Sequence, residues 1–370
     1  MSSEINKTDI ALKFLKLILL IYLFFISIGL LKEGFGLFGK DFANNLIKTT
    51  ANPIVGLCIG ILATSLVQSS SFTTTTLVTM VAGGSMSIEN AIPIVMGANI
   101  GTTITNTIVA CANMTRKQEF ERGFAAAIVH DFFNILSVLI FLPLELKTHF
   151  LSKLAYLSVG FFKQFGGFEL FDILDIIVKP VAKLISHTIV NITSDGSVFA
   201  PILCLTVACA FLFIALRYLV DTLKSIMIGP VEKLVHNYLF ANWWRALIVG
   251  TLVTMSVQSS SITTSLAVPM AAGGILALEK IFPFTLGANI GTTITAILAS
   301  MALGEPAPMT VAMVHLWFNI SGTAIFLPLQ KIPITLARKT ATLVTRNKWG
   351  VILFILIIFF LIPIIIITLE

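Results

Sequence analysis

The sequence predicts an all-α polytopic membrane protein made of two inverted-topology repeats with broken or re-entrant helices. The prediction comes from the composition, from uncharged windows long enough to span a bilayer, and from an internal duplication. Hydrophobic residues make up 56% of the 370 residues and charged residues 11%, against about 25% charged residues in a soluble chain. Mean hydropathy is +0.97. So little charge cannot cover a water-facing surface, which excludes a soluble enzyme.

Charge and cysteine content exclude further classes. The net charge of +6 comes from 24 Lys and Arg residues dispersed between apolar stretches, so no nucleic-acid partner is expected. The four cysteines lie in apolar stretches without ligand-type spacing and predict neither a disulfide nor a metal centre. The apolar run 17–31 lacks a cleavage pattern and is predicted to be the first membrane helix rather than a signal peptide.

Several further windows meet the length of about 20 residues that a membrane helix needs. They lie at 90–115, 123–144, 198–216, 281–304, 306–330 and 350–369, of which 123–144 contains one acidic residue. Two uncharged segments, 49–88 and 246–278, are too long for one straight crossing and carry polar patches. Each is expected to contain either a re-entrant hairpin plus one crossing or three crossings.

Basic residues predict the orientation, because Lys and Arg favour the cytoplasmic side in short loops. Segment 331–348 contains five basic residues and no acid, and the link 304–308 contains no basic residue. We therefore expect 331–348 inside, 304–308 outside and a cytoplasmic N-terminus. The expected location is the plasma membrane, as a multi-pass protein of the bacterial inner membrane.

An internal duplication is the strongest signal in the chain. GANIGTTIT occurs at 97–105 and again at 287–295, and at the same offset QSSSFTTT (68–75) matches QSSSITTS (258–265). The odd number of crossings per copy predicts that the second copy is inverted, as in many secondary transporters. We expect membrane repeat 1 at 1–145, an extracytoplasmic connecting loop at 146–197, inverted repeat 2 at 198–330, and a basic cytoplasmic loop with a final membrane helix at 331–370.

The Gln-Ser-Ser-Ser patches predict a binding site. On a continuous helix their hydroxyls would point in every direction. One or two hydroxyls in a membrane helix commonly hydrogen-bond to a neighbouring helix. A dense patch would instead expose several hydroxyls to lipid, which is unfavourable. Broken backbone at this depth is tolerated where it lines a cavity. A half-helix N-terminus suits an anion, and hydroxyls with freed carbonyls suit Na⁺. An oxyanion flanked by sodium ions fits such a site.

Asp131 is the acidic residue in the interior of a predicted membrane segment, which makes it a functional candidate. Its repeat mate is Leu316, so the predicted site is asymmetric in charge. Asn134, three residues further on, is the expected co-ligand. His130 and His315 are expected to be hydrogen-bonded helix-packing histidines. The glycines of GANIG permit close backbone approach or unwinding, and the alternative is a helix-packing face.

The paired QSSS and GANIGTT motifs, with the runs AIPIVMGANIGTTITNTIVA and VHDFFNILSVLIFLPLE, resemble the type II sodium-dependent phosphate cotransporter family (Na/Pi cotransporter). The resemblance covers roughly residues 50–145 and 245–330. It implies sodium-coupled symport of inorganic phosphate, mainly divalent, into the cell by alternating access. The Asp after His130 implies electrogenic transport. The chain looks like a bacterial-type member without a PhoU-like regulatory domain.

We assign roles to the motif residues on this basis. The predicted phosphate-binding residues are Gln68, Ser69, Ser70, Gln258, Ser259 and Ser260. The predicted sodium-binding residues are Ser71, Thr103, Asp131, Asn134, Ser261 and Thr293. Supporting roles are assigned to Asn99, Thr102, Asn289, Thr292 and Asn319. No cofactor is expected, with Na⁺ as the coupling ion. The expected partners are phosphate, sodium and the lipid bilayer, and the oligomeric state is left open.

Other functions are compatible with the same motifs. The first alternative is a sodium symporter for another oxyanion or a small carboxylate, and the second is an anion channel, which would conduct without sodium. A membrane enzyme with Ser70 or Ser260 as nucleophile is the weakest alternative, since no Ser, His and carboxylate constellation occurs in both copies. We expect the protein not to be an enzyme.

Overall fold

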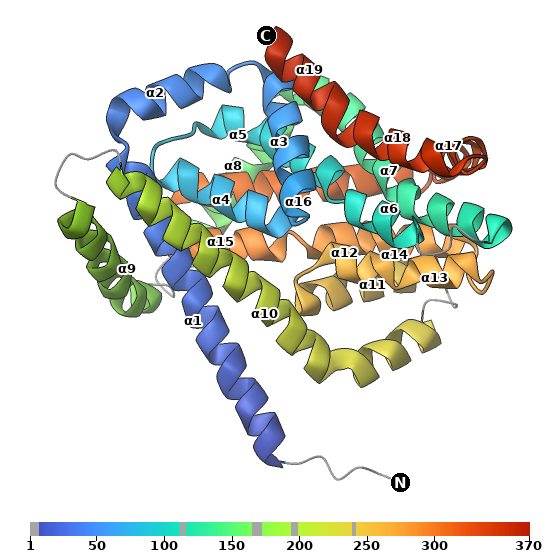
Figure 1. The fold of residues 1–370 in the computed structure, drawn as a ribbon, viewed down its shortest axis with the longest axis horizontal. Coiled ribbons are helices and arrows are strands. Elements are labelled where there is room, and N and C mark those ends of the chain that lie inside the picture. The colour runs from blue at the N-terminus through green and yellow to red at the C-terminus, as the bar shows by residue number, and fades with distance from the viewer. Residues whose placement is uncertain (1–6, 112–115, 165–171, 194–198, 239–241) are drawn as a thin grey trace.

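The computed structural model describes residues 7–111, 116–164, 172–193, 199–238 and 242–370, and in these ranges the chain is helical with short connections and no strand (Figure 1). The first half contains α1 (Lys7–Leu37), α2 (Gly39–Thr49), α3 (Pro53–Val67), α4 (Ser70–Ala82), α5 (Ile88–Gly101), α6 (Ile104–Ala110), α7 (Lys117–Thr148), α8 (Phe150–Gln164) and α9 (Asp172–Thr193). The second half contains α10 (Phe199–Tyr238), α11 (Trp243–Val257), α12 (Ser260–Ser265), α13 (Ala267–Ala272), α14 (Leu278–Gly291), α15 (Ile294–Leu303), α16 (Pro306–Phe326), α17 (Lys331–Val344), α18 (Lys348–Leu356), the π-helical turn η3 (Ile357–Leu361) and α19 (Ile362–Leu369). The predicted all-α class is confirmed.

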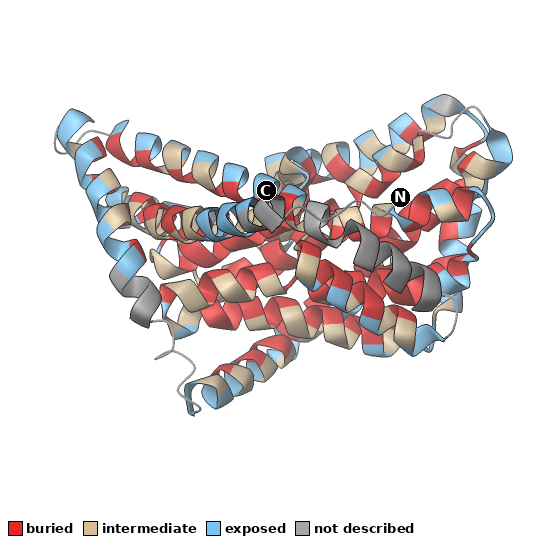
Figure 2. Ribbon diagram, turned by 90° about the horizontal axis from the view of Figure 1, so that it is seen from below, coloured by how far each residue is buried: buried red, intermediate tan, exposed pale blue. Residues whose placement is uncertain are grey.

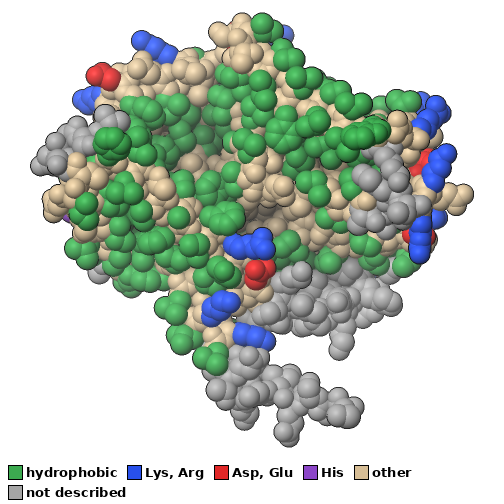
Figure 3. All heavy atoms as spheres, viewed as in Figure 1, with side chains coloured by type: hydrophobic (Ala, Val, Ile, Leu, Met, Phe, Trp, Pro, Cys, Tyr) green, Lys and Arg blue, Asp and Glu red, His purple; other side chains and the backbone are tan. Residues whose placement is uncertain are grey.

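Within the described chain, seven helical stretches are long and apolar enough to cross a membrane. They are Leu12–Leu37, Ile88–Ala110, Lys117–Thr148, Phe199–Leu223, Leu278–Leu303, Pro306–Phe326 and Trp349–Leu369. Each overlaps one of the windows expected from the sequence. The chain is therefore a multi-pass membrane protein. Apolar side chains cover much of the face shown in Figure 3, as lipid contact requires.

Both over-long segments divide in the same way. The first forms α3 and α4, which are separated by a two-residue break at Gln68 and Ser69, before α5 begins. The second forms α11, then α12 and α13, separated at the equivalent Gln258 and Ser259, before α14 begins. The predicted breaks in the helices are thus confirmed.

The interval 146–197, where the sequence analysis expected a connecting loop, contains two helices in its described part. The buried Glu145 carboxylate accepts the backbone N–H groups of Leu151, at 2.6 Å, and Ser152, so it caps the start of α8. Helix α9 lies against α1, where Tyr22 donates to the carbonyl of Ile177 at 3.2 Å. The physical reason is that apolar residues recur at helical spacing in this segment, although charged residues lie between them. The basic segment after 330 likewise begins with a helix, α17.

Glycines bring two pairs of parallel helices into backbone contact. A Cβ atom at Gly60 of α3 would overlap the carbonyl of Ile94, and one at Gly97 of α5 would overlap the carbonyl of Leu57. Gly250 and Gly287 make the equivalent contacts between α11 and α14. The first glycine of GANIG therefore serves as a helix-packing residue, and the helix continues through the motif to Gly101 and Gly291 rather than unwinding.

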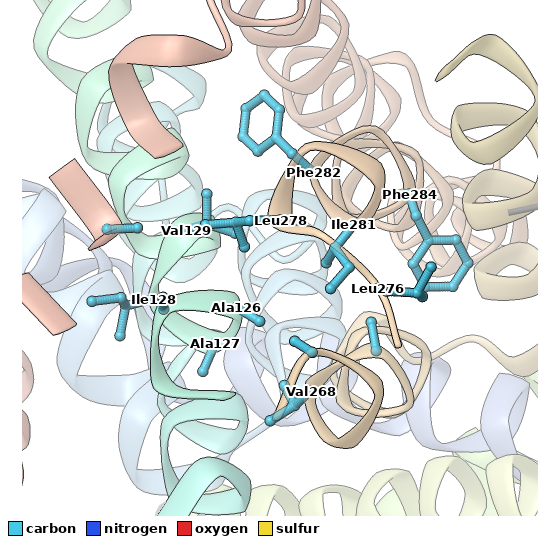
Figure 4. Close-up of a cluster of buried hydrophobic side chains, with 14 of the residues drawn as sticks. Ala126, Ala127, Ile128, Val129, Val268, Leu276, Leu278, Ile281, Phe282 and Phe284 are labelled. Atoms are coloured by element: carbon cyan, nitrogen blue, oxygen red, sulfur yellow. The ribbon is translucent and has the colours of Figure 1, made fainter. Parts of the chain in front are cut away.

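The two repeats are interlocked through their cores. Helix α7 of the first packs against α14 of the second, and reciprocally α16 of the second packs against α5 of the first. Figure 4 shows one shared cluster, in which Ala126 to Val129 of α7 face Val268, Ile281 and Phe282 from α13 and α14. Buried residues concentrate on these central helices (Figure 2). This reciprocal packing of helices from the two repeats brings the two broken segments close together.

Candidate functional site

The first Gln-Ser-Ser-Ser segment forms a sharp helix-to-helix tip. Gln68 adopts the left-handed conformation with φ 55°, and its N–H closes α3 on the carbonyl of Thr64 at 2.7 Å. Ser69 is extended, and its hydroxyl accepts the N–H of Phe72 at 3.2 Å as the N-cap of α4. A left-handed glutamine is uncommon and strained. Because α4 begins at this tip, the backbone N–H groups of its first turn have no carbonyl partner within the helix.

The second segment repeats this geometry. Gln258 has φ 56°, and its N–H bonds to the carbonyl of Thr254 at 2.6 Å. Ser259 is extended and caps α12 by accepting the N–H of Ile262 at 3.4 Å. The three non-glycine residues with positive φ in the described chain are His149 and these two glutamines. The strained backbone thus recurs at matched positions of the duplication.

The two tips reach each other across the repeat interface. The Ser71 hydroxyl lies 3.4 Å from both the carbonyl of Gln258 and the hydroxyl of Thr295. The Ser261 hydroxyl lies 3.4 Å from the carbonyl of Thr102. One helical turn further, Thr264 and the Asn106 amide exchange two hydrogen bonds of 2.7 and 3.0 Å. Residues 158 to 224 positions apart in the chain therefore form one polar contact region.

A cavity of about 880 Å³ lies at the tips. Its described lining includes Gln68, Ser69, Ser70, Ser71, Gln258, Ser259, Ser260, Ser261, Thr105 and Thr292. Apolar residues of α10 complete the wall, together with Arg217 and Asp221. Figure 3 shows a hollow in this face of the molecule, next to a neighbouring pair of basic and acidic side chains. All residues predicted for phosphate, and two of those predicted for sodium, line this cavity.

Four asparagines form a second polar cluster deeper in the bundle. Asn134 donates to the carbonyl of Asn99 at 2.7 Å, and its repeat mate Asn319 donates to the carbonyl of Asn289 at 2.8 Å. The Asn289 amide also donates to Asn134 at 3.0 Å, across the repeats. His315 lies 3.2 Å from the side-chain oxygen of Asn99. All are buried, and this network ties the central helices of the two copies together.

Asp131 lies on α7 beside this network. Its side chain is 1% exposed, and neither carboxylate oxygen has a hydrogen-bond partner among the described residues. Thr103, at the joint between α5 and α6, is its neighbour, and the Thr103 hydroxyl donates to the carbonyl of Ile100 at 2.7 Å. Burying a carboxylate without a partner is costly, so this position suits a bound cation.

The structure therefore separates the predicted site residues into two groups. The Gln-Ser-Ser-Ser residues and Thr292 line the cavity. Asp131, Asn134, Thr103 and Thr293, with Asn99, Thr102, Asn289 and Asn319, are buried outside the lining, although the carbonyl of Thr102 accepts from Ser261. The sequence analysis gave Thr105 of GANIGTTIT no specific role and did not identify Arg217 or Asp221. A charged pair four residues apart, next to an uncharged window, was the available signal.

The fold and the cavity define the class of the protein. It is a multi-pass membrane protein in which two internal copies present matching broken helices to one polar cavity, an arrangement typical of secondary transporters.

The particular family follows from comparison with known proteins. The chain belongs to the Na⁺/Pi-cotransporter family, whose model matches residues 23–166 and 211–361. It is 34% identical over 415 residues to the sodium-dependent phosphate transport protein 2A of Rattus norvegicus, covering 93% of this chain and 65% of that protein. It is 33% identical over 442 residues to the sodium-dependent phosphate transport protein 2B of Homo sapiens, covering 94% of this chain and 64% of that protein.

The chain thus spans slightly less than two thirds of the length of these curated relatives. No solved structure matches it. The expected family is confirmed, and it is a family of transporters rather than enzymes.

Proposed function

We propose that this protein is a sodium-coupled symporter that carries inorganic phosphate, mainly the divalent form, into the cell by alternating access. The observation that carries the proposal is the meeting of two strained Gln-Ser-Ser-Ser tips at one cavity inside the bundle. Family membership and the names of the relatives support phosphate and sodium as the transported ions. The proposal includes a location in the plasma membrane with a cytoplasmic N-terminus, and the distribution of basic residues supports that orientation.

The phosphate ligands are assigned to the tips. Ser69, Ser70 and Gln68 surround the start of α4, where freed N–H groups and the positive end of a helix dipole attract an anion. Ser259, Ser260 and Gln258 contribute hydroxyl and amide groups from the other tip. Phosphate can lose its water shell here at a modest cost in free energy, because each of these donors replaces a hydrogen bond to water.

Sodium is assigned to oxygen-rich positions where the tips meet and at the buried Asp131 beside the asparagine cluster. Asp131 offers two carboxylate oxygens without hydrogen-bond partners in the described structure, and Thr103 is next to it. Ser71 and Ser261 offer hydroxyls where the tips meet. Hard cations prefer such oxygen ligands. Sodium ions held near the tips would offset the charge of the phosphate and so couple the binding of the two ions. An additional sodium ion held at Asp131 would leave a net positive charge moved in each cycle, which makes transport electrogenic.

The test is uptake of labelled phosphate into proteoliposomes with sodium, lithium or potassium outside. We expect uptake against a gradient with sodium, and little uptake with potassium. Ser70→Ala combined with Ser260→Ala should abolish uptake, whereas Ser265→Ala should retain it, because Ser265 bonds to the carbonyl of Ile262 and is not part of the cavity lining. Phosphate flux that does not depend on sodium would indicate a channel and contradict the proposal.

Competition experiments separate phosphate from other anions. Arsenate, a close structural analogue, should compete with labelled phosphate, and sulfate and small carboxylates should compete weakly. Stronger sodium-dependent uptake of a carboxylate or of sulfate than of phosphate would assign the same cavity to a different substrate.

A further inference from the structure

Helix α10 carries an ion pair near the end of its candidate membrane span. The Nε atom of Arg217 lies 3.6 Å from a carboxylate oxygen of Asp221, four residues later, and both residues belong to the candidate span Phe199–Leu223. Charged residues inside a membrane span are costly and mark pathways for ions or substrates by default. At 3.6 Å the contact is too long for a hydrogen bond, so the pair is loosely held.

Both residues line the cavity that the two tips form. They lie on one face of α10 together with Phe213 and Cys209, at intervals of four residues. Among the described residues of the lining, Arg217 is the basic one and Asp221 the acidic one. Arg217 lines the cavity and its side chain is 67% exposed, so neighbouring side chains do not seal the guanidinium.

Arg217 carries the positive charge on this part of the wall. The tips themselves contribute hydroxyls, amides and backbone groups but no fixed charge. A guanidinium presents a planar fork of donors that matches the oxygens of a phosphate, and it remains charged at all relevant pH values.

We propose that Arg217 is an oxyanion-recruiting residue of this cavity, and that the incoming phosphate displaces Asp221 as its partner. Before binding, Asp221 neutralises the guanidinium and holds it beside the cavity. During binding, phosphate takes that position and keeps its contact with Arg217 while the hydroxyl groups of the tips bind its other oxygens. Attraction grows with the charge of the ligand, so Arg217 favours divalent over monovalent anions. The inference rests on the proposed function and adds a specificity-determining residue outside the duplicated motifs.

The test is equilibrium binding of labelled phosphate to the purified protein in detergent, where both sides of the protein are accessible. Arg217→Gln should raise the Kd for phosphate about tenfold or more, since charged hydrogen bonds of this kind are lost. Arg217→Lys should give an intermediate Kd, because the charge remains without the fork. Asp221→Asn should lower the Kd by removing the competing carboxylate. The sodium dependence of binding should persist in all three variants.

Arg245→Gln is the matched control. Arg245 stacks on Trp244, with 5.1 Å between the guanidinium carbon and the ring centre, and it is not part of the cavity lining. Its substitution should leave the Kd unchanged. Added choline chloride should raise the Kd of the unmodified protein more than that of Arg217→Gln, because screening acts on the arginine charge.

Three results would overturn the inference and leave the proposed function intact. They are a Kd of Arg217→Gln within about twofold of the unmodified value, an equal rise in Arg245→Gln, or a loss of maximal binding without a change of Kd. If the unmodified protein shows no sodium-dependent phosphate binding, the proposed function fails, and this inference fails with it.

Discussion

The two broken segments share their tips but differ in the helices that follow. Gln68 and Gln258 have the same left-handed backbone, with φ of 55° and 56°, and each precedes a serine N-cap. After the first tip, α4 is continuous over 13 residues, whereas the second continues as α12 and α13, which meet at Leu266. Both copies keep the strained tip but not the same helix after it. We therefore assign ion binding to the tips, and not to the helices that follow them.

A second difference concerns charge. Asp131 of the first repeat corresponds to Leu316 of the second, although the histidines and asparagines around them correspond in pairs. The Asn134 and Asn319 hydrogen bonds to the carbonyls of Asn99 and Asn289 are the same in both copies. The duplication therefore preserves a shared scaffold around a carboxylate that occurs once. Three experiments test how far the equivalence extends.

The largest effect is expected where the copies are most alike, at the glycines of helix contact. Gly97→Leu and Gly287→Leu should each prevent folding, because the new side chain would begin inside a backbone carbonyl of the neighbouring helix. The loss should exceed the about 1–3 kcal/mol of ordinary overpacking. Gly36→Leu is the control, since nothing lies within 4 Å of a Cβ there. Size-exclusion chromatography in detergent would measure the folded fraction, and two well-folded variants would contradict the close packing.

An intermediate effect is expected from making the first hairpin resemble the second. Pro269 lacks the N–H that a continuous helix would donate to Ser265, and its repeat mate Thr79 lies within α4. Thr79→Pro should destabilise the protein by about 3 kcal/mol, whereas Pro269→Thr should change stability by less than about 1 kcal/mol.

Thermal unfolding in detergent provides the comparison, with Thr79→Ala to account for the lost hydroxyl, which bonds to the carbonyl of Thr76 at 2.6 Å. Equal stability of Thr79→Pro and Thr79→Ala would contradict the prediction that an unbroken α4 stabilises the fold.

The smallest effect on transport is expected at the asymmetric carboxylate. Asp131→Gly should retain phosphate uptake but move less net charge per phosphate, because one cation site is lost. Leu316→Gly, the same change at the repeat mate, should leave the charge per phosphate unaltered. Simultaneous measurement of current and labelled phosphate uptake gives the ratio. An unchanged current per phosphate in Asp131→Gly would refute the assignment of Asp131 to sodium.

The sequence predicted the tips well and their surroundings less well. Gln68 and Gln258 stand out because hydroxyl density, apolar flanks and repetition all occur within one short segment. Arg217 and Asp221 were not identified, since which face of α10 meets the cavity depends on how that helix packs. Helices α8 and α9 were expected as a loop because their charged residues hide the apolar periodicity.

The amino-acid sequence by itself determined the membrane class, the candidate spans, the duplication and the positions of the helix breaks, since each depends on local composition or on spacing along the chain. Only the tertiary structure decided which helices exchange partners, that both tips reach one cavity, that asparagines from both copies bond together, and that α10 completes the wall. Those features depend on contacts between residues far apart in the chain, and such contacts exist only once the helices have packed.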